Sequence, residues 1–430
     1  MGMMSNRNPE RSFGAASGDR APATADRARE WRLGLPTLYG EGLCLREPTA
    51  ADATQLSALV TPGTAWRFTP SAPDSDAGWA RFVQQLRADR AAGLNVCYAV
   101  IREQTAEVTG LIMVRRFELG FRIAECHFLF SEAAWTSALA ARSLGYMLDF
   151  VFLDIGVHRL EARSSTAHEG DTLRSLGCVP EGVLREACPL PGGFVDETIW
   201  SMLRADWLSN PLPAPRRGPA GDHPPDTGPA ADGADNRDPL PDWSKALPTL
   251  VGPTVTLREI DSRDGAALLQ VIDPVEIEVC MEPPPKTIEM FQQYIAWARR
   301  QRACGRAACY STFANGRPDP IGMLHLRSRD QRFAIAECGI FLAPASRGIS
   351  AYAEAMNLVM PLLFDTIGAH RLESRTSATN SAAIGSLRRL GALKEACLRQ
   401  SFLKGGTYVD DELWTLLARD WRARIQDIRR

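Results

Sequence analysis

The chain has 430 residues, of which 45% are hydrophobic and 23% are charged, and its formal net charge is −2. These values are ordinary for globular domains, and the balanced charge argues against a protein that binds nucleic acid or a membrane surface. No run of about eighteen apolar residues occurs, so no transmembrane helix is predicted, and the polar N-terminus has no secretory signal. The ten cysteines form no CxxC pair, which favours reduced, buried thiols and a cytoplasmic location.

The chain contains the same sequence twice. Residues 123–165 and 335–377 align at a constant offset of 212 without a gap, and both contain the motifs IAEC and HRLE. The segments that open with LPTL, at 35–47 and 247–259, also match. A repeat of this length indicates two copies of a whole domain, called copy one and copy two below.

Composition predicts the boundaries of the two copies. Residues 1–34 are rich in Gly, Ala, Ser and Arg and are expected to be disordered. Residues 208–241 are dominated by Pro, Gly, Ala and Asp, which is typical of a linker. Copy one is therefore expected at 35–207 and copy two at 242–422, and a short basic tail at 423–430 ends the chain.

Each copy is predicted to contain the same elements in the same order. In copy one these are a strand at 43–46, helices at 52–60 and 77–91, strands at 97–102 and 110–115, the IAEC strand, a helix at 138–152, the HRLEARS strand, a helix ending at 176–177, and two strands ending at Trp200. In copy two the corresponding elements include a strand at 255–258, helices at 264–272 and 287–304, strands at 307–313 and 321–326, a helix at 350–364, a helix ending at 390–391, and a last strand ending at Trp414. This order predicts an α/β fold with a mixed, mostly antiparallel sheet flanked by helices.

The junction between the IAEC strand and the long helix of copy two is suited to binding an anion. Its sequence is AECGIFLAPASRGISAYAEA. The first N–H groups of a helix are unpaired and the helix dipole favours negative charge there. Gly348 allows close approach of a phosphate, and Arg347 adds a positive charge. The alternative is an ordinary strand-to-helix turn with a surface arginine.

Copy two resembles the GCN5-related N-acetyltransferase (GNAT) family, and within it the ribosomal-protein Nα-acetyltransferase branch. The resemblance covers nearly all of 247–422, and the ordered set of motifs carries it, because no single motif is specific. The matching residues are Ala336, Glu337, Gly339, Pro344, Arg347, Gly348, Glu354, Ala355, His370, Arg371, Glu373, Asn380, Leu390, Gly391 and Glu395.

The resemblance implies acetyl-coenzyme A as co-substrate and no metal. The pyrophosphate would lie on the turn at the helix start, the pantetheine arm would pair with a splayed strand, and Asn380 would bond near the arm. The implied coenzyme-binding residues are Cys338, Gly339, Ile340, Phe341, Arg347, Gly348, Ile349, Ser350, Ala351 and Asn380. Two departures matter: Ser350 replaces the second glycine of RGxG, and Ala383 replaces a serine that can protonate the departing thiolate, so another acid or water is needed.

Copy one departs further from the family pattern. Trp135-Thr136 stands where copy two has Arg347-Gly348, and His127 stands at the position of Gly339. His168 takes the place of Asn380, and two residues are missing near 168–172. We interpret copy one as a structural or substrate-shaping domain that has lost coenzyme binding; the alternative is a diverged site that uses another acyl donor.

Acyl transfer to an amine requires a deprotonated amine, because an ammonium group has no lone pair. A carboxylate, usually through water, can take the proton, and N–H groups of the splayed strand can stabilise the oxyanion. Glu337 is the first candidate for the base, with Glu125 as its counterpart in copy one. The alternative is that both are strand glutamates paired to an arginine such as Arg371 or Arg375. Tyr408 is a candidate acid, with packing as the alternative.

Other recurring residues have a simpler interpretation. His158 and His370 occupy identical contexts and are expected to be structural. Trp66 and Trp297 lie in helical segments that border the acceptor groove in the family and are expected in the core. The segments 60–76 and 273–287, which would shape that groove, are the least alike between the copies.

The sequence therefore predicts an acyl-coenzyme-A-dependent N-acyltransferase with one working site, in copy two. The reaction expected is acetyl transfer to a primary amine, on a peptide or protein N-terminus or a small molecule, by direct attack in a ternary complex. The alternative is a non-catalytic tandem module that binds a ligand or partner, and aminoacyl transfer from tRNA is disfavoured by the lack of a basic stripe. Neither nucleic acid nor a membrane is an expected partner, and a homodimer is left open.

Overall fold

The computed structural model describes residues 30–60, 64, 67–68, 73, 75–116, 121–220, 242–271, 287–330, 332–343, 346 and 349–429. The first 29 residues and most of the predicted linker therefore lie outside the described residues. No helix in the described part of the chain has the length and hydropathy needed to cross a membrane.

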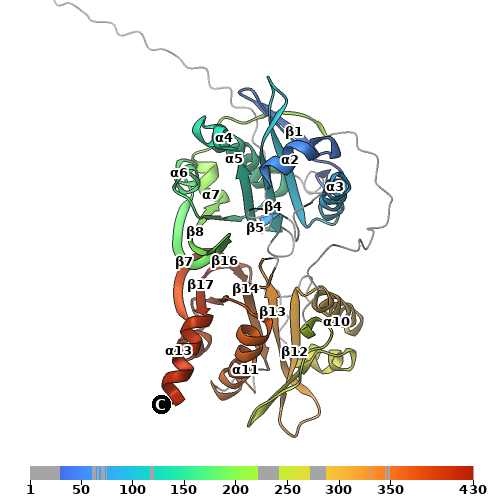
Figure 1. Cartoon of the computed structure of the whole chain (residues 1–430), viewed down its shortest axis with the longest axis vertical. Coiled ribbons are helices and arrows are strands. Elements are labelled where there is room, and N and C mark those ends of the chain that lie inside the picture. The colour runs from blue at the N-terminus through green and yellow to red at the C-terminus, as the bar shows by residue number, and fades with distance from the viewer. Residues whose placement is uncertain are drawn as a thin grey trace, which may run out of the picture.

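The two copies have the same α/β architecture and lie one above the other (Figure 1). The strands of copy one are β1 (Pro36–Gly40), β2 (Leu43–Arg46), β3 (Asn95–Arg102), β4 (Glu107–Arg116), β5 (Ile123–Phe130), β6 (Arg159–Ser164), β7 (Val179–Leu190), β8 (Gly193–Leu203) and β9 (Arg216–Ala220). Those of copy two are β10 (Leu250–Val251), β11 (Val255–Glu259), β12 (Ala307–Ala314), β13 (Pro320–Ser328), β14 (Ile335–Leu342), β15 (Arg371–Ser377), β16 (Leu393–Lys404) and β17 (Thr407–Leu417).

The helices also correspond between the copies. Copy one has α2 (Ala53–Leu59), α3 (Asp76–Ala91), α4 (Glu132–Thr136), α5 (Leu139–Phe150), α6 (Ala167–Ser175) and α7 (Arg204–Ser209). Copy two has α8 (Gly265–Val271), α10 (Ile288–Ala303), α11 (Ile349–Pro361), α12 (Ser381–Leu390) and α13 (Ala418–Arg429). The predicted element order is confirmed, with the short strands β1, β9 and β10 and the helices α4, α7 and α13 in addition.

The pairings of the described strands join both copies into one sheet. The strand order is β9-β1-β2-β3-β4-β5-β6-β8-β7 in copy one and β16-β17-β15-β14-β13-β12-β11-β10 in copy two. Only β5–β6 and β14–β15 are parallel. The copies meet where β7 pairs with β16 at Gly182 and Ala396. This crossing needs a glycine, because a Cβ at Gly182 would lie 2.1 Å from the carbonyl oxygen of Glu395.

Each copy has its own hydrophobic core between the sheet and its long helix. Tyr98, Phe128 and Phe150 lie in the core of copy one, and Tyr310 and Phe364 in that of copy two. A smaller cluster belongs to both copies, because it combines side chains of β7 and β8 with side chains of β16 and β17. Its members are Leu184, Ala187, Ile199, Ala396, Leu398 and Leu413.

The boundaries of the copies differ from those expected. Trp31 is only 4% exposed and packs in the core of copy one, so ordered structure begins before residue 35. Strand β9 pairs with β1, which extends copy one into the predicted linker. The predicted basic tail belongs to α13, which runs to Arg429.

The interface between the copies has approximate two-fold symmetry. Arg163 of copy one forms a bidentate ion pair with Glu373 at 2.9–3.1 Å, and the equivalent Arg375 pairs with Glu161 at 2.8–2.9 Å. The tips of the closing hairpins, β7–β8 and β16–β17, reach across to the other copy (Figure 1). The ring of Tyr408 stacks on His158, with centroids 3.5 Å apart.

The reciprocal contact stacks Phe194 on His370, with centroids 3.8 Å apart. The predicted structural role of the two histidines fits these positions. The two copies are therefore docked through buried ion pairs, stacked rings and a shared apolar cluster rather than separated by a free linker.

Candidate active site

Strand β14 separates from β15 at the place predicted for the pantetheine arm. The two strands pair only from Ile335 to Glu337, whereas β14 remains paired with β13 as far as Leu342. The edge of Cys338–Phe341 that faces β15 therefore has no ladder partner, which confirms the predicted splay. Unpaired main-chain N–H and C=O groups of this kind need a partner.

The two faces of β14 have different surroundings. On one face, Sγ of Cys338 lies 3.8 Å from Sδ of Met356 on α11, and Tyr352 packs against the same core. On the other face lie Glu337 and Gly339, because residues two apart on a strand share a face. Gly339 is paired with His325 of β13 and has no side chain on this face.

Some of the predicted coenzyme-binding residues lie in the described part of the chain, and others do not. Helix α11 begins at Ile349 and Ser350, and Ala351 packs on the core in its first turn. Arg347 and Gly348 lie outside the described residues. Asn380 is exposed and forms the N-cap of α12, where its Oδ1 accepts a hydrogen bond from the N–H of Ala383 at 3.1 Å.

Glu337 is a buried carboxylate held by two arginines. It accepts hydrogen bonds from Arg327 at 2.9 Å and from Arg329 at 3.1 Å. Burial alone would raise its pKa, but the charges of Arg327, Arg329 and Arg375 outweigh burial and lower the pKa to about 2. Its ion-pair partners are thus not the two arginines expected, yet the contacts fit the interpretation of Glu337 as a paired strand glutamate.

Glu125, the counterpart of Glu337, is tied to it through Arg329. One nitrogen of Arg329 donates to Glu125 at 2.6 Å while another donates to Glu337. Burial would raise the pKa of Glu125, but Arg329 and His127 hold it well below its usual range. The single guanidinium of Arg329 therefore links the equivalent carboxylates of the two copies.

Tyr408, the predicted acid, lies in the interface. It sits near the tip of the β16–β17 hairpin and stacks on His158 of copy one. This contact fits the alternative interpretation, in which Tyr408 packs between the copies. Trp297, expected in the core, is 43% exposed on α10 and contacts Tyr294. Trp66 lies outside the described residues.

Sequence reasoning missed two titratable residues on the strands next to β14 and β15. Asp411 on β17 is buried, and burial raises its pKa to about 6 although the hydroxyl of Ser401 donates to it at 2.9 Å. His325 is also buried, and burial lowers its pKa to about 4. A signal for Asp411 exists in the repeat, because VDDELW in copy two matches VDETIW in copy one and both carry an acid at this position.

Copy one has a similar strand separation, and a tryptophan packs on one face of β5. Strands β5 and β6 pair as far as Cys126. The ring of Trp135 lies edge-on to Phe128 and Phe130, at 6.0 and 5.1 Å between centroids. These phenylalanines are equivalent to Ile340 and Leu342. The indole therefore packs on the face of β5 that carries Phe128 and Phe130, against the core of copy one.

The caps of α6 and α12 correct the alignment of the two copies. Thr166 caps α6 by accepting from the N–H of Glu169, as Asn380 caps α12. The counterpart of Asn380 is therefore Thr166 and not His168. The two additional residues of copy two precede the cap, at 378 and 379.

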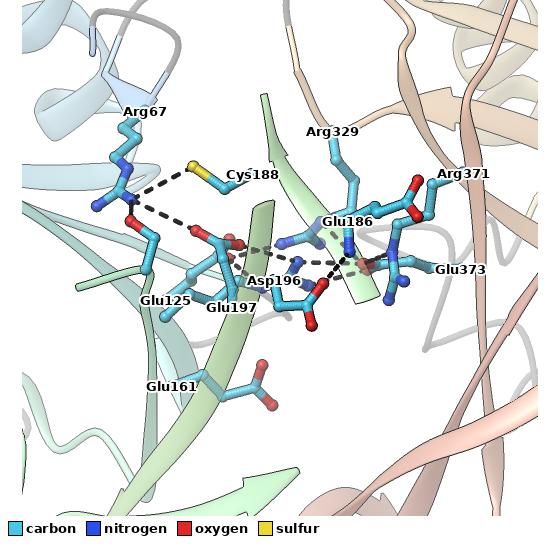
Figure 2. Close-up of polar contacts among 12 residues, drawn as sticks. Arg67, Glu125, Glu161, Glu186, Cys188, Asp196, Glu197, Arg329, Arg371 and Glu373 are labelled. Carbon is cyan, nitrogen blue, oxygen red and sulfur yellow. Dashed lines mark hydrogen bonds and ion pairs between the residues drawn. The ribbon is translucent and has the colours of Figure 1, made fainter. Parts of the chain in front are cut away.

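A cavity of about 210 Å³ lies beside the splayed strand of copy one, at its border with copy two. Glu125, His127 and Glu197 line it together with arginines of both copies. Figure 2 shows Arg67 directed toward Cys188 and Glu197, which lie 3.9 and 3.4 Å from its guanidinium. It also shows Arg329 reaching from copy two toward Glu373.

Comparison with known proteins identifies the family. The model of the acetyltransferase (GNAT) domain matches residues 42–175 and 254–393, which together are more than half of the chain. The chain therefore belongs to the GNAT acetyltransferase family, with one domain in each copy. It is an N-acetyltransferase, as the resemblance predicted.

The relatives are each about as long as one copy. The uncharacterized N-acetyltransferase p20 of Bacillus licheniformis is 24% identical over 176 residues, which are 40% of this chain and 99% of that protein. A probable GNAT acetyltransferase of Chromobacterium violaceum is 26% identical, with a TM-score of 0.35, and the match spans 40% of this chain and 88% of that protein. The ribosomal-protein-S5-alanine acetyltransferase of Vibrio fischeri is 17% identical, covers 40% and 98%, and has a TM-score of 0.36.

Proposed function

We propose that copy two transfers the acetyl group of acetyl-coenzyme A to a primary amine, by direct attack of the amine on the thioester in a ternary complex. The observation that carries this proposal is the separation of β14 from β15 after Glu337. The edge of β14 is unpaired there, and copy one has Trp135-Thr136 where copy two has the proposed pyrophosphate-binding Arg347-Gly348. This difference supports one working site, in copy two.

The residues present fit the coenzyme. GNAT enzymes use acetyl-coenzyme A, and the main-chain groups of Cys338–Phe341 offer the partners that the amide groups of a pantetheine arm require. The start of α11, with Arg347–Ala351, would hold the pyrophosphate, because helix N-termini bind anions. N–H groups of the splayed strand would stabilise the oxyanion of the tetrahedral intermediate.

The amine approaches the face of β14 that carries Glu337 and Gly339, opposite the face that packs on α11. The charge of Arg375 acts to lower the pKa of both Glu337 and Asp411. Both carboxylates are therefore close enough to Arg375 to feel its charge, which supports their position on this face of the sheet. A general base works best when its pKa lies near the working pH. Asp411, whose pKa is about 6, meets this condition better than Glu337, whose pKa is about 2.

Asp411 therefore takes the amine proton through water in this proposal. Glu337 is a positioning residue that fixes Arg327 and Arg329, and Tyr408 supports the interface. Because Ala383 has no hydroxyl group, water protonates the departing thiolate. The acceptor is a primary amine of a peptide or protein N-terminus or of a small molecule.

Release of coenzyme A by the full chain, measured with N-terminal peptides and small amines as acceptors, tests the proposal. We expect turnover with at least one amine, and a fall in kcat of about a hundredfold in Asp411→Asn, the lower end of what proton transfer contributes. Asp171→Asn makes the same chemical change at an exposed position of copy one and serves as the control. Loss of activity in Glu337→Gln with retention in Asp411→Asn would return the base role to Glu337.

Failure of every amine, with acetyl-coenzyme A still bound, would favour the alternative function, a tandem module that binds a ligand without catalysis. The observation that favours this alternative is the presence of Ser350 and Ala383, where copy two departs from the family pattern.

A further inference from the structure

We propose that the cavity of copy one binds a small hydroxydicarboxylate at the seam between the two copies. This site lies outside the proposed acetyl-transfer site, and the proposal holds whether or not copy two transfers acetyl groups. Three properties of the cavity support it: its size, the charge of its wall, and two buried polar atoms whose nearest partners lie at 3.5 Å or more.

The size suits a molecule of about nine non-hydrogen atoms. A cavity of about 150 Å³ in another protein accommodates benzene, and the present cavity measures about 210 Å³. Most pockets for drug-sized ligands begin at about 300 Å³. The enclosed space therefore matches a small molecule.

The wall is strongly positive. Its arginines, which outnumber its carboxylates by six to two, are Arg67, Arg115, Arg116, Arg163, Arg327 and Arg329. Arg163 directs its shortest ion pair away from this wall, to Glu373. Guanidinium groups bind carboxylates through paired hydrogen bonds, so two carboxylates on one ligand would match this wall.

Arg115 is the arginine best placed to bind a ligand. It donates to the carbonyl oxygen of Phe68 at 2.7 Å and contacts Sδ of Met113 at 3.2 Å. No described carboxylate lies within ion-pair distance of Arg115. Four other arginines of the wall have such partners: Arg67, Arg163, Arg327 and Arg329. Arg115 lies opposite Glu125 in the β4–β5 pairing without forming an ion pair with it, so its guanidinium is available to a ligand carboxylate.

Two buried polar atoms of the wall also lack hydrogen bonds within the described structure. They are Oε2 of Glu197, whose side chain is 1% exposed, and Nε2 of His127. The nearest groups are 3.8 Å away for Glu197, in Arg163, and 3.5 Å for His127, in Glu125. Buried polar groups are nearly always paired, and a ligand hydroxyl can donate to Glu197 and accept from His127.

Copy two has no equivalent of this site among its described residues, although arginines of copy two form part of its wall. At the equivalent positions copy two has Gly339 for His127 and Asp411 for Glu197. Arg327 and Arg329 come from copy two and also hold Glu337. A bound dicarboxylate would therefore join the copies and contact the same arginines that position the carboxylate beside the proposed active site.

Calorimetric titration of L-malate into the full chain, without acetyl-coenzyme A, tests the proposal. We expect one site per chain and a rise in Tm on binding, since a ligand that binds only the folded state stabilises it. Succinate, which lacks the hydroxyl group, should bind about tenfold more weakly because Glu197 stays unpaired.

Arg115→Met should weaken malate binding by about tenfold or more, the effect of losing a charge-assisted hydrogen bond. Arg263→Met, the same change at an exposed arginine of copy two, is the matched control and should bind malate normally. If Arg115→Met does not fold, His127→Gly, which installs the residue of copy two, provides the second test. Absence of malate binding at millimolar concentration, or binding that neither cavity variant weakens, would overturn the proposal.

Discussion

Removing Arg375 should destabilise the whole chain, because it leaves a buried carboxylate without its main partner. The side chain of Arg375 is 5% exposed and that of Glu161 is 2% exposed, and the two form a bidentate pair across the interface. Burial would raise the pKa of Glu161, but Arg375 and Arg159 lower it to about 2 from the ordinary 4.5. A shift of this size corresponds to about 3 kcal/mol of stability at neutral pH.

The sign of the pH dependence follows from the lowered pKa. Since Glu161 binds protons more weakly in the folded chain than in the unfolded chain, its contribution is complete above about pH 4.5 and disappears as the pH falls toward 2. Arg375→Met should therefore lower the free energy of unfolding at pH 7 by about 3 kcal/mol, the lower end of the cost of breaking a buried pair. The lower end applies because Arg159 still contacts Glu161 at 3.1 Å.

Urea unfolding followed by tryptophan fluorescence measures this loss, and a double-mutant cycle with Glu161→Gln isolates the pair. Arg422→Met is the control, because its ion pair with Asp365 is half exposed and should contribute less than about 1 kcal/mol. A coupling energy between Arg375 and Glu161 below about 0.5 kcal/mol would refute the reasoning, since the pair would then contribute no more than a surface contact.

Three further changes test other parts of the structure. Gly182→Ala should lower the urea midpoint, because its Cβ would meet the carbonyl oxygen of Glu395 at 2.1 Å; an unchanged midpoint would mean that β7 and β16 do not cross there. Trp135→Ala should cost about 2 kcal/mol in the same assay through loss of packing on Phe130, and no loss would show that the indole does not cover β5. His325→Met should reduce the fall in stability from pH 6.5 to pH 4: burial lowers the pKa of His325 to about 4, so the native chain binds fewer protons in this range than the unfolded chain and loses stability as the pH drops. An unchanged pH profile would show that His325 is not buried.

Local patterns in the sequence were sufficient to predict most of the elements. The strand expected at 43–46 coincides with β2, and the helix expected at 77–91 begins one residue earlier, at Asp76. Alternating or helical spacing of apolar residues determines such elements wherever one face is buried. Strands β1 and β9 were missed because PTLYG and RRGPA contain Pro and Gly, and they form strands through pairing with segments distant in the sequence: β9 with β1, and β1 also with β2.

The candidate site could be predicted in part. The splay of β14 followed from the family motifs, and the pairing pattern confirms it. The partners of Glu337 did not follow, because Arg327 and Arg329 lie on and after β13 and reach Glu337 only once the two strands pair. The pKa of a carboxylate depends on its burial and on the charges near it in the fold. The order of residues along the chain shows neither.

The docking of the copies could not be predicted from the repeat. The HRLE motif predicted a strand, yet its glutamate forms an ion pair across the interface in both copies: Glu161 pairs with Arg375, and Glu373 with Arg163. Which charges meet across the interface depends on how β7 and β16 approach, and the Pro-rich segment between the copies allowed either docking or separation.

Calorimetric titration of acetyl-coenzyme A into the full chain tests the central claim, one coenzyme site located in copy two. The informative variants are Gly348→Glu in copy two and Thr136→Glu at the equivalent position of copy one, because each places a negative charge where a pyrophosphate would bind. One site per chain that is lost in Gly348→Glu and retained in Thr136→Glu is the expected result. Two sites per chain, or a site lost in Thr136→Glu and retained in Gly348→Glu, would contradict the assignment of the coenzyme to copy two.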